Sequence, residues 1–387
     1  MRSWPSSCRL LSALAIVACS SQQKADGNLV APIAAMPLKA AFADAFVVGA
    51  AINDAQFTGR DPRGAQLIAA QFNTVTPENV LKWENVHPSR GKYVFAPGDA
   101  YVDFGTKNKM AIIGHTLVWH SQTPSWVFND QSGKPLGREA LLAVMRDHIM
   151  TVVGRYKRRI KGWDVVNEAL NEDGSLRQSS WYRGIGEDYL VKAFQYAHEA
   201  DPSAELYYND YSLENGAKRN GAVRLIQMLQ KAGVKVSAIG TQSHVKMDWP
   251  SSAQYDSTLN AFAALGVHVN VTELDVDVLP PATRGQGADV ATRGAVSPMG
   301  NPWPTALPDS MQRALAHRYA DLFRVFVAHR DVIDRVTFWG VGDGDSWLNN
   351  WPVRGRTSYP LLFDRSDQPK PALDSVLATA AHLRQRD

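Results

Sequence analysis

Residues 47–52 read Val-Val-Gly-Ala-Ala-Ile, a run that contains no charged or hydrogen-bonding side chain. A second β-like run, Val-His-Val-Asn-Val-Thr, occupies residues 267–272 and contains no Asp, Glu, Lys or Arg. Strands that are apolar along nearly their whole length are typical of a parallel sheet buried on both faces. These two runs therefore predict a parallel sheet that extends through most of the chain.

Six further β-like runs are present, five between these two and one after them, and they alternate with amphipathic helical stretches. Strict alternation of strand and helix is typical of parallel βαβ units. The predicted strands are 46–52, 73–76, 111–117, 162–166, 205–208, 238–242, 267–272 and 336–339. The predicted helices are 61–71, 98–109, 138–156, 187–200, 217–232, 252–265, 310–329 and 371–384.

Two architectures are built from such units: the closed (β/α)8 TIM barrel and the doubly wound open sheet. Eight units fill the chain, and no Gly-x-Gly-x-x-Gly turn follows the first strand, so we favour the α/β barrel as a single domain over residues 38–387. The stretch 280–308 is too long for a routine connection, and we expect it to form a mobile loop on the catalytic face.

The N-terminus resembles a secretory signal. Arg2 and Arg9 precede the apolar run 10–18, which is too short to span a bilayer. The segment 16–19, Ile-Val-Ala-Cys, resembles the bacterial lipobox, in which the Cys is lipidated after cleavage. The alternative is an ordinary signal peptide in which Cys19 is incidental.

We therefore expect a lipoprotein-type signal over 1–18 and a flexible tether over 19–37, which is small, polar and Pro-containing. Export across the inner membrane, with anchoring to a bacterial membrane through Cys19 in the periplasm or at the cell surface, would follow; without lipidation the protein would be extracellular. The other cysteine, Cys8, lies in the leader, so the mature domain has no disulfide.

Composition narrows the possible partners. The formal net charge is +3, and no basic block with interleaved aromatic residues is present, which argues against a nucleic-acid partner. The chain has 11 Trp, several of them in Gly- or Pro-flanked stretches, where such side chains can stack on sugar rings. We expect a monomer that needs no cofactor.

Polar residues gather where the predicted strands end. The carboxyl ends of all strands in a (β/α)8 barrel line one face, where active sites are built. Eight segments converge there: 76–79 with 82–83, 114–122, 163–168, 209–211, 242–244, 272–275, Trp339 and Trp347. A cleft with carboxylates, amides, His and Trp, but without a Gly-rich phosphate loop, suits a neutral polar substrate.

Glycoside hydrolysis needs two carboxyl groups that flank one bond. Glu168 and Glu273 are the best pair, because each ends a predicted strand of the same barrel. One must be protonated and the other ionised, which their environments must enforce. His244 is placed to hold Glu273 ionised, and Asp275, two residues along the same strand face, is placed to orient His244.

Other interpretations of these residues exist. His115, His120 and His244 suggest a metal site, but their spacing fits no common zinc pattern and no Cys accompanies them, so we predict no metal. Glu78 and Lys82 fit either an i,i+4 helical pair or a loop, and the neighbouring Pro and Trp are compatible with a loop.

At these motifs the sequence resembles glycoside hydrolase family 10, the barrel xylanases, from about residue 38 to 383. The motifs occur in the family's order, and none is specific alone. They are TPENxxKW at 76–83, GHTLVWH at 114–120, WDVVNE at 163–168, YYNDY at 207–211, QSH at 242–244, TELD at 272–275, and PLLFD at 360–364 with PKPA at 369–372.

The resemblance implies an endo-β-1,4-xylanase that acts on xylan and xylo-oligosaccharides with retention of anomeric configuration. Glu168 would be the acid/base and Glu273 the nucleophile, with Asn167 on the 2-hydroxyl of the sugar. Further implied substrate contacts are Glu78, Asn79 and Lys82 on the glycone sugars, His115, Trp119, Asn167, Tyr211, Gln242 and His244 near the reacting sugar, and Trp339 and Trp347 as stacking walls.

The chain departs from the family's pattern at three places. Ser212 stands where Asn is frequent, Gly342 and Gly344 stand where bulkier residues are frequent, and Leu373 stands where Tyr is common. These departures concern contacts with the leaving part of the substrate and the stiffness of the loop 339–347. None of them touches the two carboxylates.

Two rival functions remain open at this point. One is another β-glycanase on the same barrel, acting on cellulose, mannan or mixed-linkage glucan. The other is a catalytically inactive glycan-binding protein of the cell surface, against which the intact pair Glu168 and Glu273 argues.

Overall fold

The chain divides into two units, Met1–Pro32 and Ile33–Asp387. The computed structural model of the protein describes residues 36–281 and 300–383, all within the second unit. The predicted signal over 1–18, Cys19 and most of the predicted tether lie outside the described residues, so they stay predictions.

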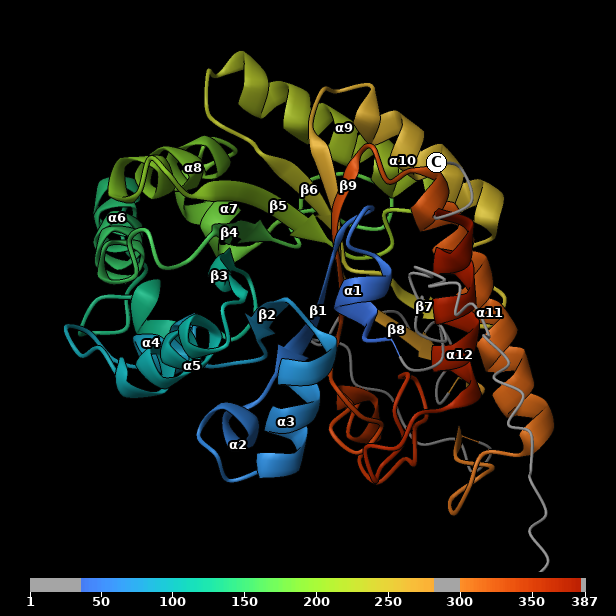
Figure 1. The fold of residues 1–387 in the computed structure, drawn as a ribbon. Helices are drawn as coiled ribbons and strands as arrows, with labels where there is room; N and C mark the ends of the chain where they lie inside the picture. Colours follow the sequence, from blue (N-terminus) through green and yellow to red (C-terminus); the bar gives the residue numbers. More distant parts are fainter. Residues whose placement is uncertain (1–35, 282–299, 384–387) are drawn as a thin grey trace, which may run out of the picture. The chain divides into compact units, whose positions relative to one another are not determined.

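Nine strands are described, and eight of them close into a barrel (Figure 1). Every pairing is parallel, β1 pairs with both β2 and β9, and β6 pairs with β8, which joins the two ends of the sheet. The predicted (β/α)8 barrel is therefore confirmed. The strands are β1 Val47–Ile52, β2 Thr74–Pro77, β3 Ala111–Trp119, β4 Gly162–Asn167, β5 Glu205–Asp210, β6 Ala238–Thr241, β7 His244–Lys246, β8 His268–Asp277 and β9 Ile333–Phe338.

Helices follow the barrel strands and surround them, with α6 beside α8 on one side and α11 beside α12 on another (Figure 1). The eight predicted helices are present, each end within four residues of its predicted position. They are α3 Pro62–Gln71, α5 Ala96–Lys107, α6 Arg138–Arg155, α8 Tyr189–Ala200, α9 Gly216–Lys231, α10 Ser252–Ala263, α11 Asp309–Ala328 and α12 Pro371–Ala380, which a 3-10 turn Ala381–Leu383 extends.

Short helices were missed by the sequence analysis, because one turn carries too little periodicity to identify. These are α1 Leu38–Ala41, α2 Asp54–Phe57, α4 Trp83–Val86 and α7 Ser180–Ile185, with 3-10 turns at Ser125–Val127 and Trp347–Asn349. None of the helices within the described residues combines the length and apolar content needed to cross a membrane.

Local sequence explains several helix starts. Asn53 and Ser251 each form a capping box with a Gln three residues later, which satisfies backbone N–H groups at the first turns of α2 and α10. Asp61 caps α3 at Gly64 N, and Pro62 occupies the first helical position, where its missing N–H costs nothing.

Large side chains pack closely against glycines on both faces of the barrel wall. A Cβ on Gly114 would lie 2.1 Å from the Trp163 ring, and one on Gly162 would lie 2.2 Å from the hydroxyl of Tyr207. Both positions therefore require glycine. Tyr207 packs with Ile113 and Ala238 in a buried cluster separate from the main core, as expected for a barrel interior packed with side chains rather than open as a pore.

One strand, β8, extends five residues beyond its predicted end. The sequence placed the end of the seventh strand at residue 272, but β8 continues to Asp277, because β7 pairs with its last three residues, Asp275–Asp277. Glu273 and Asp275 thus lie inside a strand rather than after it. Their side chains share one face of the strand, since residues i and i+2 point the same way.

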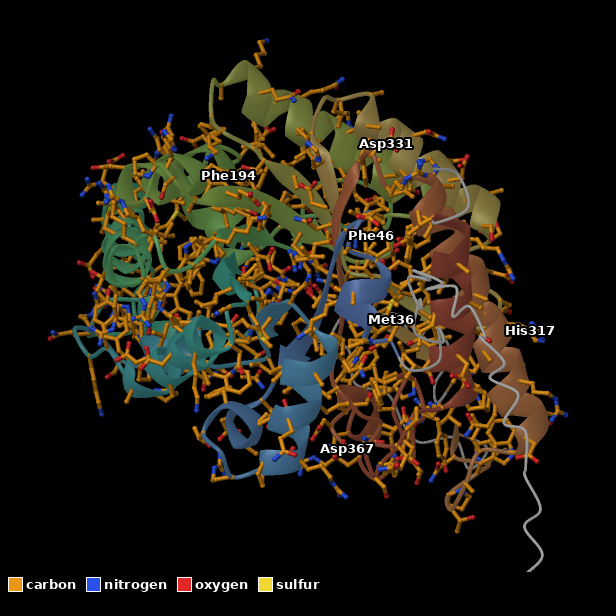
Figure 2. All side chains as sticks on the ribbon, in the orientation of Figure 1. Met36, Phe46, Phe194, His317, Asp331 and Asp367 are labelled. Carbon is orange, nitrogen blue, oxygen red and sulfur yellow. The ribbon has the colours of Figure 1, made fainter. Side chains whose placement is uncertain are left out.

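The long connection 280–308 starts after β8, at the end of the barrel that carries the predicted site. Residues 282–299 lie outside the described residues, and the predicted mobility is untested. The flanks are held by Arg356, which donates from Nε to the Gly300 carbonyl at 2.9 Å and from Nη2 to the Pro280 carbonyl at 3.1 Å. Figure 2 labels Asp331, two residues before β9 begins, near the top of the view. It labels Asp367, which follows β9 in the chain, near the bottom.

Candidate active site

A cavity of about 200 Å³ opens at the carboxyl ends of the barrel strands. Most of the predicted site residues line it, although they come from positions up to 269 residues apart in sequence. The lining residues are Glu78, Asn79, Lys82, His115, Trp119, Gln122, Asn167, Glu168, Gln242, His244, Glu273, Trp339 and Trp347.

Glu168 follows the last residue of β4, and its backbone adopts a left-handed conformation with φ 56°. Its N–H still donates to the Asn209 carbonyl of β5 at 2.9 Å, so the turn is fixed by the neighbouring strand. The carboxyl group accepts from Trp119 Nε1 at 2.8 Å and from Gln242 Nε2 at 3.0 Å. These contacts aim the carboxyl group into the cavity.

The environment of Glu168 favours its protonated form. Burial is the largest cause, the negative charges of Asp210 and Glu273 add to it, and the pKa of Glu168 rises to about 7 despite the hydrogen bonds from Gln242 and Trp119. A carboxyl group that holds its proton near neutral pH is suited to general acid catalysis.

Glu273 lies in the opposite electrostatic situation, although it is equally buried. Burial acts to raise the pKa of Glu273, but a hydrogen bond from His244, positive charge at His115 and His244, and a hydrogen bond from Asn209 together lower it below its usual range. The distances are 3.1 Å from His244 Nε2 to Oε2 and 2.9 Å from Asn209 Nδ2 to Oε1. Glu273 is therefore the ionised member of the pair.

Asn209 links the two carboxyl groups. Its Nδ2 donates to Glu273 Oε1 and to Asn167 Oδ1, both at 2.9 Å, and Thr272 Oγ1 donates to its Oδ1 at 2.7 Å, which fixes the orientation of the amide. Asn167 in turn donates to Glu168 Oε1 at 3.3 Å. The two carboxyl groups are thus held in one hydrogen-bonded network across β4, β5 and β8.

His244 lies between two carboxylates. Its Nδ1 is 3.0 Å from Asp275 Oδ2, and its Nε2 faces Glu273. Burial acts to lower the pKa of His244, but the two carboxylates outweigh burial and raise it to about 10. Trp347 Nε1 donates to the same Asp275 oxygen at 2.7 Å. The predicted arrangement, with Asp275 orienting His244 toward Glu273, agrees with these distances.

The end of the cavity near β2 is lined by Glu78, Asn79 and Lys82. Residues 78–82 form a turn rather than a helix, so the loop interpretation of Glu78 and Lys82 is correct. Lys82 Nζ donates to Asn79 Oδ1 at 3.0 Å and to Gln122 Oε1 at 2.9 Å. Burial and the nearby charge of Asp345 raise the pKa of Glu78 to about 7. These groups offer several donors and acceptors to hydroxyl groups.

His115 and Trp339 form another part of the wall. His115 Nδ1 lies 2.9 Å from Asp164 Oδ2, and the imidazole meets the Trp339 ring edge-on with centroids 5.4 Å apart. Within residues 36–281 and 300–383, no group of three or more His, Cys, Asp and Glu side chains is arranged to hold a metal ion.

The loop 339–347, which carries both tryptophans, is tied to the PLLFD and PKPA motifs. Lys370 Nζ donates to Asp343 Oδ2 at 2.9 Å, and both side chains are buried. A Cβ on Gly342 would lie 2.9 Å from the Asp364 carbonyl, so this departure from the family pattern permits a close approach of two chain segments. Trp347 also stacks on Trp351, with centroids 4.7 Å apart.

Tyr211 is not among the residues that line this cavity, and its predicted substrate contact stays a prediction. Its hydroxyl accepts from Arg177 Nη2 at 2.9 Å, and Lys218 Nζ lies 3.3 Å from its ring centroid. These contacts hold the buried ring against α9. Leu373, another departure, is buried in the main core, an environment that suits an apolar side chain.

Two residues of the site were missed by the sequence analysis. Gln122 lines the cavity and Asn209 joins the carboxyl groups. Both stand in segments that were identified at strand ends, 114–122 and 209–211, so position alone could have suggested them. Which side chain of such a segment turns inward depends on the register of neighbouring strands.

Comparison with known proteins gives a consistent result. Residues 37–379 match the sequence model of Glycosyl hydrolase family 10. The chain is 43% identical over 356 residues to Endo-1,4-beta-xylanase A of Xylanibacter ruminicola, covering 91% of this chain and 96% of that protein. It is 39% identical over 344 residues to Endo-1,4-beta-xylanase of Geobacillus stearothermophilus, covering 88% and 97%.

Solved structures agree with the fold. A GH10 endoxylanase retrieved from sugarcane soil metagenome superposes with a TM-score of 0.85 at 47% identity, covering 88% of this chain and 99% of that one. Xylanase XynB from Paenibacillus barcinonensis gives a TM-score of 0.80 at 40% identity, covering 88% and 98%. With its closed barrel and its family match over nearly all of the described residues, this chain belongs to glycosyl hydrolase family 10.

Proposed function

We propose that this protein is an endo-β-1,4-xylanase that hydrolyses internal β-1,4-xylosidic bonds of xylan with retention of anomeric configuration. The observation that carries the proposal is the unequal carboxyl pair in one cavity. Burial keeps Glu168 protonated up to about pH 7, whereas His244 and Asn209 keep Glu273 ionised. Its relatives are named as xylanases, which supports xylan as the substrate.

The proposed reaction is a double displacement. A carboxylate oxygen of Glu273 attacks the anomeric carbon while the bond to the leaving oxygen breaks and Glu168 gives that oxygen its proton. Glu168, now ionised, then removes a proton from water. The resulting hydroxyl attacks the anomeric carbon, the bond to Glu273 breaks, and the enzyme returns to its starting state. In this scheme Asn167 contacts the 2-hydroxyl group.

A side-by-side assay tests the substrate. Reducing-sugar release should be much faster on xylan than on carboxymethylcellulose, mannan or mixed-linkage glucan, with Glu273→Ala as the inactive control. Preference for carboxymethylcellulose, mixed-linkage glucan or mannan would identify a different β-glycanase of the same barrel. Binding of xylan without reducing-sugar release would identify an inactive glycan-binding protein.

Proton NMR of early xylo-oligosaccharide hydrolysis tests the stereochemistry. The β-anomer should form first, with the α-anomer growing only by mutarotation. An inverting pair needs roughly 6.5–9.5 Å between its carboxyl groups to admit water, against roughly 5–5.5 Å for a retaining pair. Early α-anomer would mean that Glu273 acts as a base and that the double displacement is wrong.

We also propose that the enzyme is tethered to a bacterial membrane through a lipidated Cys19. The support is the sequence Ile-Val-Ala-Cys at 16–19 after a basic and apolar leader, followed by a small, polar stretch up to the start of the barrel. Such an anchor would keep the catalytic domain near the cell while it acts on xylan or its fragments.

A further inference from the structure

A buried ion pair lies next to the strand end that carries Glu168. Lys218 Nζ of α9 is 3.0 Å from Asp210 Oδ1, the last residue of β5, and both side chains have 0% exposure. Two charges withdrawn from water are costly unless they are paired and hydrogen-bonded, so a buried pair is weak evidence of a purely stabilising role. Neither residue lines the cavity of the active site.

The contacts of Asp210 satisfy it as an ionised carboxylate. Besides Lys218, Oδ1 accepts from the Tyr211 N–H at 2.9 Å, and Oδ2 accepts from the Leu170 N–H at 3.3 Å and from the Tyr208 hydroxyl. The Asp210 carboxylate is thus held beside the chain that leaves Glu168.

The same cluster holds the backbone around Glu168. Leu170, two residues after Glu168, donates to Asp210, and Arg177 Nε donates to the Glu168 carbonyl at 3.1 Å. Arg177 also reaches the Tyr211 hydroxyl, and Lys218 lies over the Tyr211 ring. The left-handed backbone at Glu168 is an unfavourable conformation for a residue other than glycine, so it needs surrounding contacts that enforce it.

We propose that Asp210 and Lys218 are positioning residues for Glu168: the pair fixes the chain that follows this carboxyl group and places a partly compensated negative charge beside it. The proposal rests on the proposed role of Glu168 as acid/base. Neither residue touches substrate in this scheme, and both act through Glu168.

The electrostatic part of the proposal agrees with the surroundings of Glu168. After burial, the charge of Asp210 is the largest cause that raises the pKa of Glu168, ahead of Glu273. Other titratable or charged groups approach Glu168 from every neighbouring element. These are Lys82 before α4, His115 on β3, Arg177 after β4, Asp210 on β5, Lys218 on α9, His244 on β7 and Glu273 on β8.

The pH profile of kcat/KM on xylan tests the proposal, because activity should fall as Glu168 loses its proton. Asp210→Asn should move this basic limb to lower pH by roughly one unit, since a negative charge is removed while Lys218 stays positive. Lys218→Met should move the limb to higher pH, since Asp210 loses its compensation. The double variant should move it to lower pH, by less than Asp210→Asn.

A second substrate separates positioning from general damage. An aryl xylobioside with an activated leaving group needs little protonation, so kcat/KM on it should change less than threefold in the three variants, whereas a damaged fold would lower both activities together. Lys370→Met, which breaks a second buried pair, that of Lys370 with Asp343, is the matched control. It should lower the thermal midpoint without moving the basic limb.

The outcomes discriminate clearly. An unshifted basic limb in folded Asp210→Asn overturns the proposal. A shift of the basic limb to lower pH in Lys218→Met overturns it as well. If neither single variant folds, an unshifted basic limb in the double variant overturns it. If instead Glu168→Ala hydrolyses xylan as fast as the wild type, the proposed role of Glu168 fails, and the failure is not specific to Asp210 and Lys218.

Discussion

His244 Nε2 lies 3.1 Å from Oε2 of Glu273, and the imidazole is buried between this carboxylate and that of Asp275. The two carboxylates raise the pKa of His244 to about 10, so the imidazole stays protonated at neutral pH. A fixed positive charge therefore faces Glu273 at every pH at which xylan hydrolysis would normally be measured.

His244→Asn should move the acidic limb of kcat/KM to higher pH by roughly one unit or more. Glu273 works when ionised, so its activity is present above its pKa, and loss of the positive charge raises that pKa. Asp275→Asn should not move the limb to higher pH, because His244 stays protonated over the acidic limb and the variant removes only a negative charge. A pH profile of His244→Asn that overlays the wild-type acidic limb would contradict this electrostatic role.

Glu168→Gln should alter the pH dependence of stability. The folded-state pKa of Glu168, about 7, lies above the usual 4.5, so the stability that this group contributes is fully present below pH 4.5 and is lost as the pH rises through 7. Glu168→Gln does not lose stability in this way, because an amide does not ionise. Its free energy of unfolding relative to wild type should rise by about 3 kcal/mol between pH 4.5 and pH 8.

Urea denaturation of both proteins at the two pH values measures this difference. Placing an amide near the donors Trp119 and Gln242 changes the free energy of unfolding by the same amount at both pH values. This change therefore cancels when the two pH values are compared. A relative stability that stays constant across this range would show that Glu168 is ionised in the folded protein at neutral pH.

Substitution of the two carboxylates should give different chemical phenotypes. Glu273→Ala should lose turnover on all substrates, since no covalent intermediate can form. Glu168→Ala should lose roughly 10²–10⁴-fold on xylan but far less on aryl xylobiosides with activated leaving groups, with azide accelerating turnover. Equal losses of Glu168→Ala on both substrates, measured as kcat/KM, would assign the acid to another residue.

Cys19 should carry an acyl modification in the native protein. One acyl chain holds a protein only weakly at a membrane, so a stable anchor needs more than one chain. Mass spectrometry of the native N-terminus should show an acylated Cys19, and Cys19→Ser should release the enzyme from the membrane fraction. An unmodified N-terminus elsewhere, such as near Ala25, would rule out the anchor.

Much of the site was predictable because a (β/α)8 barrel converts chain order into spatial order. Once alternating strands and helices indicate a barrel, the residues that end its strands must share one face. Glu168 and Glu273 were paired in this way. Lys82, His115 and Gln242 stand in segments placed on the same face, and the family resemblance implied their substrate contacts; all five residues line the cavity. The order of the motifs then identified the family without any distance.

The tertiary structure decided which of these residues face the cavity and how they are charged. Tyr211 turns toward Arg177 and Lys218, β7 lengthens β8 so that Glu273 lies within a strand, and Asn209 connects the two carboxyl groups. These features depend on strand register and on side chains that approach from distant segments. The sequence by itself determined the barrel and the carboxyl pair, because both follow from residue type and periodicity along the chain. Only the tertiary structure made one carboxyl group neutral and the other ionised, because burial and charge at each depend on neighbours far away in sequence.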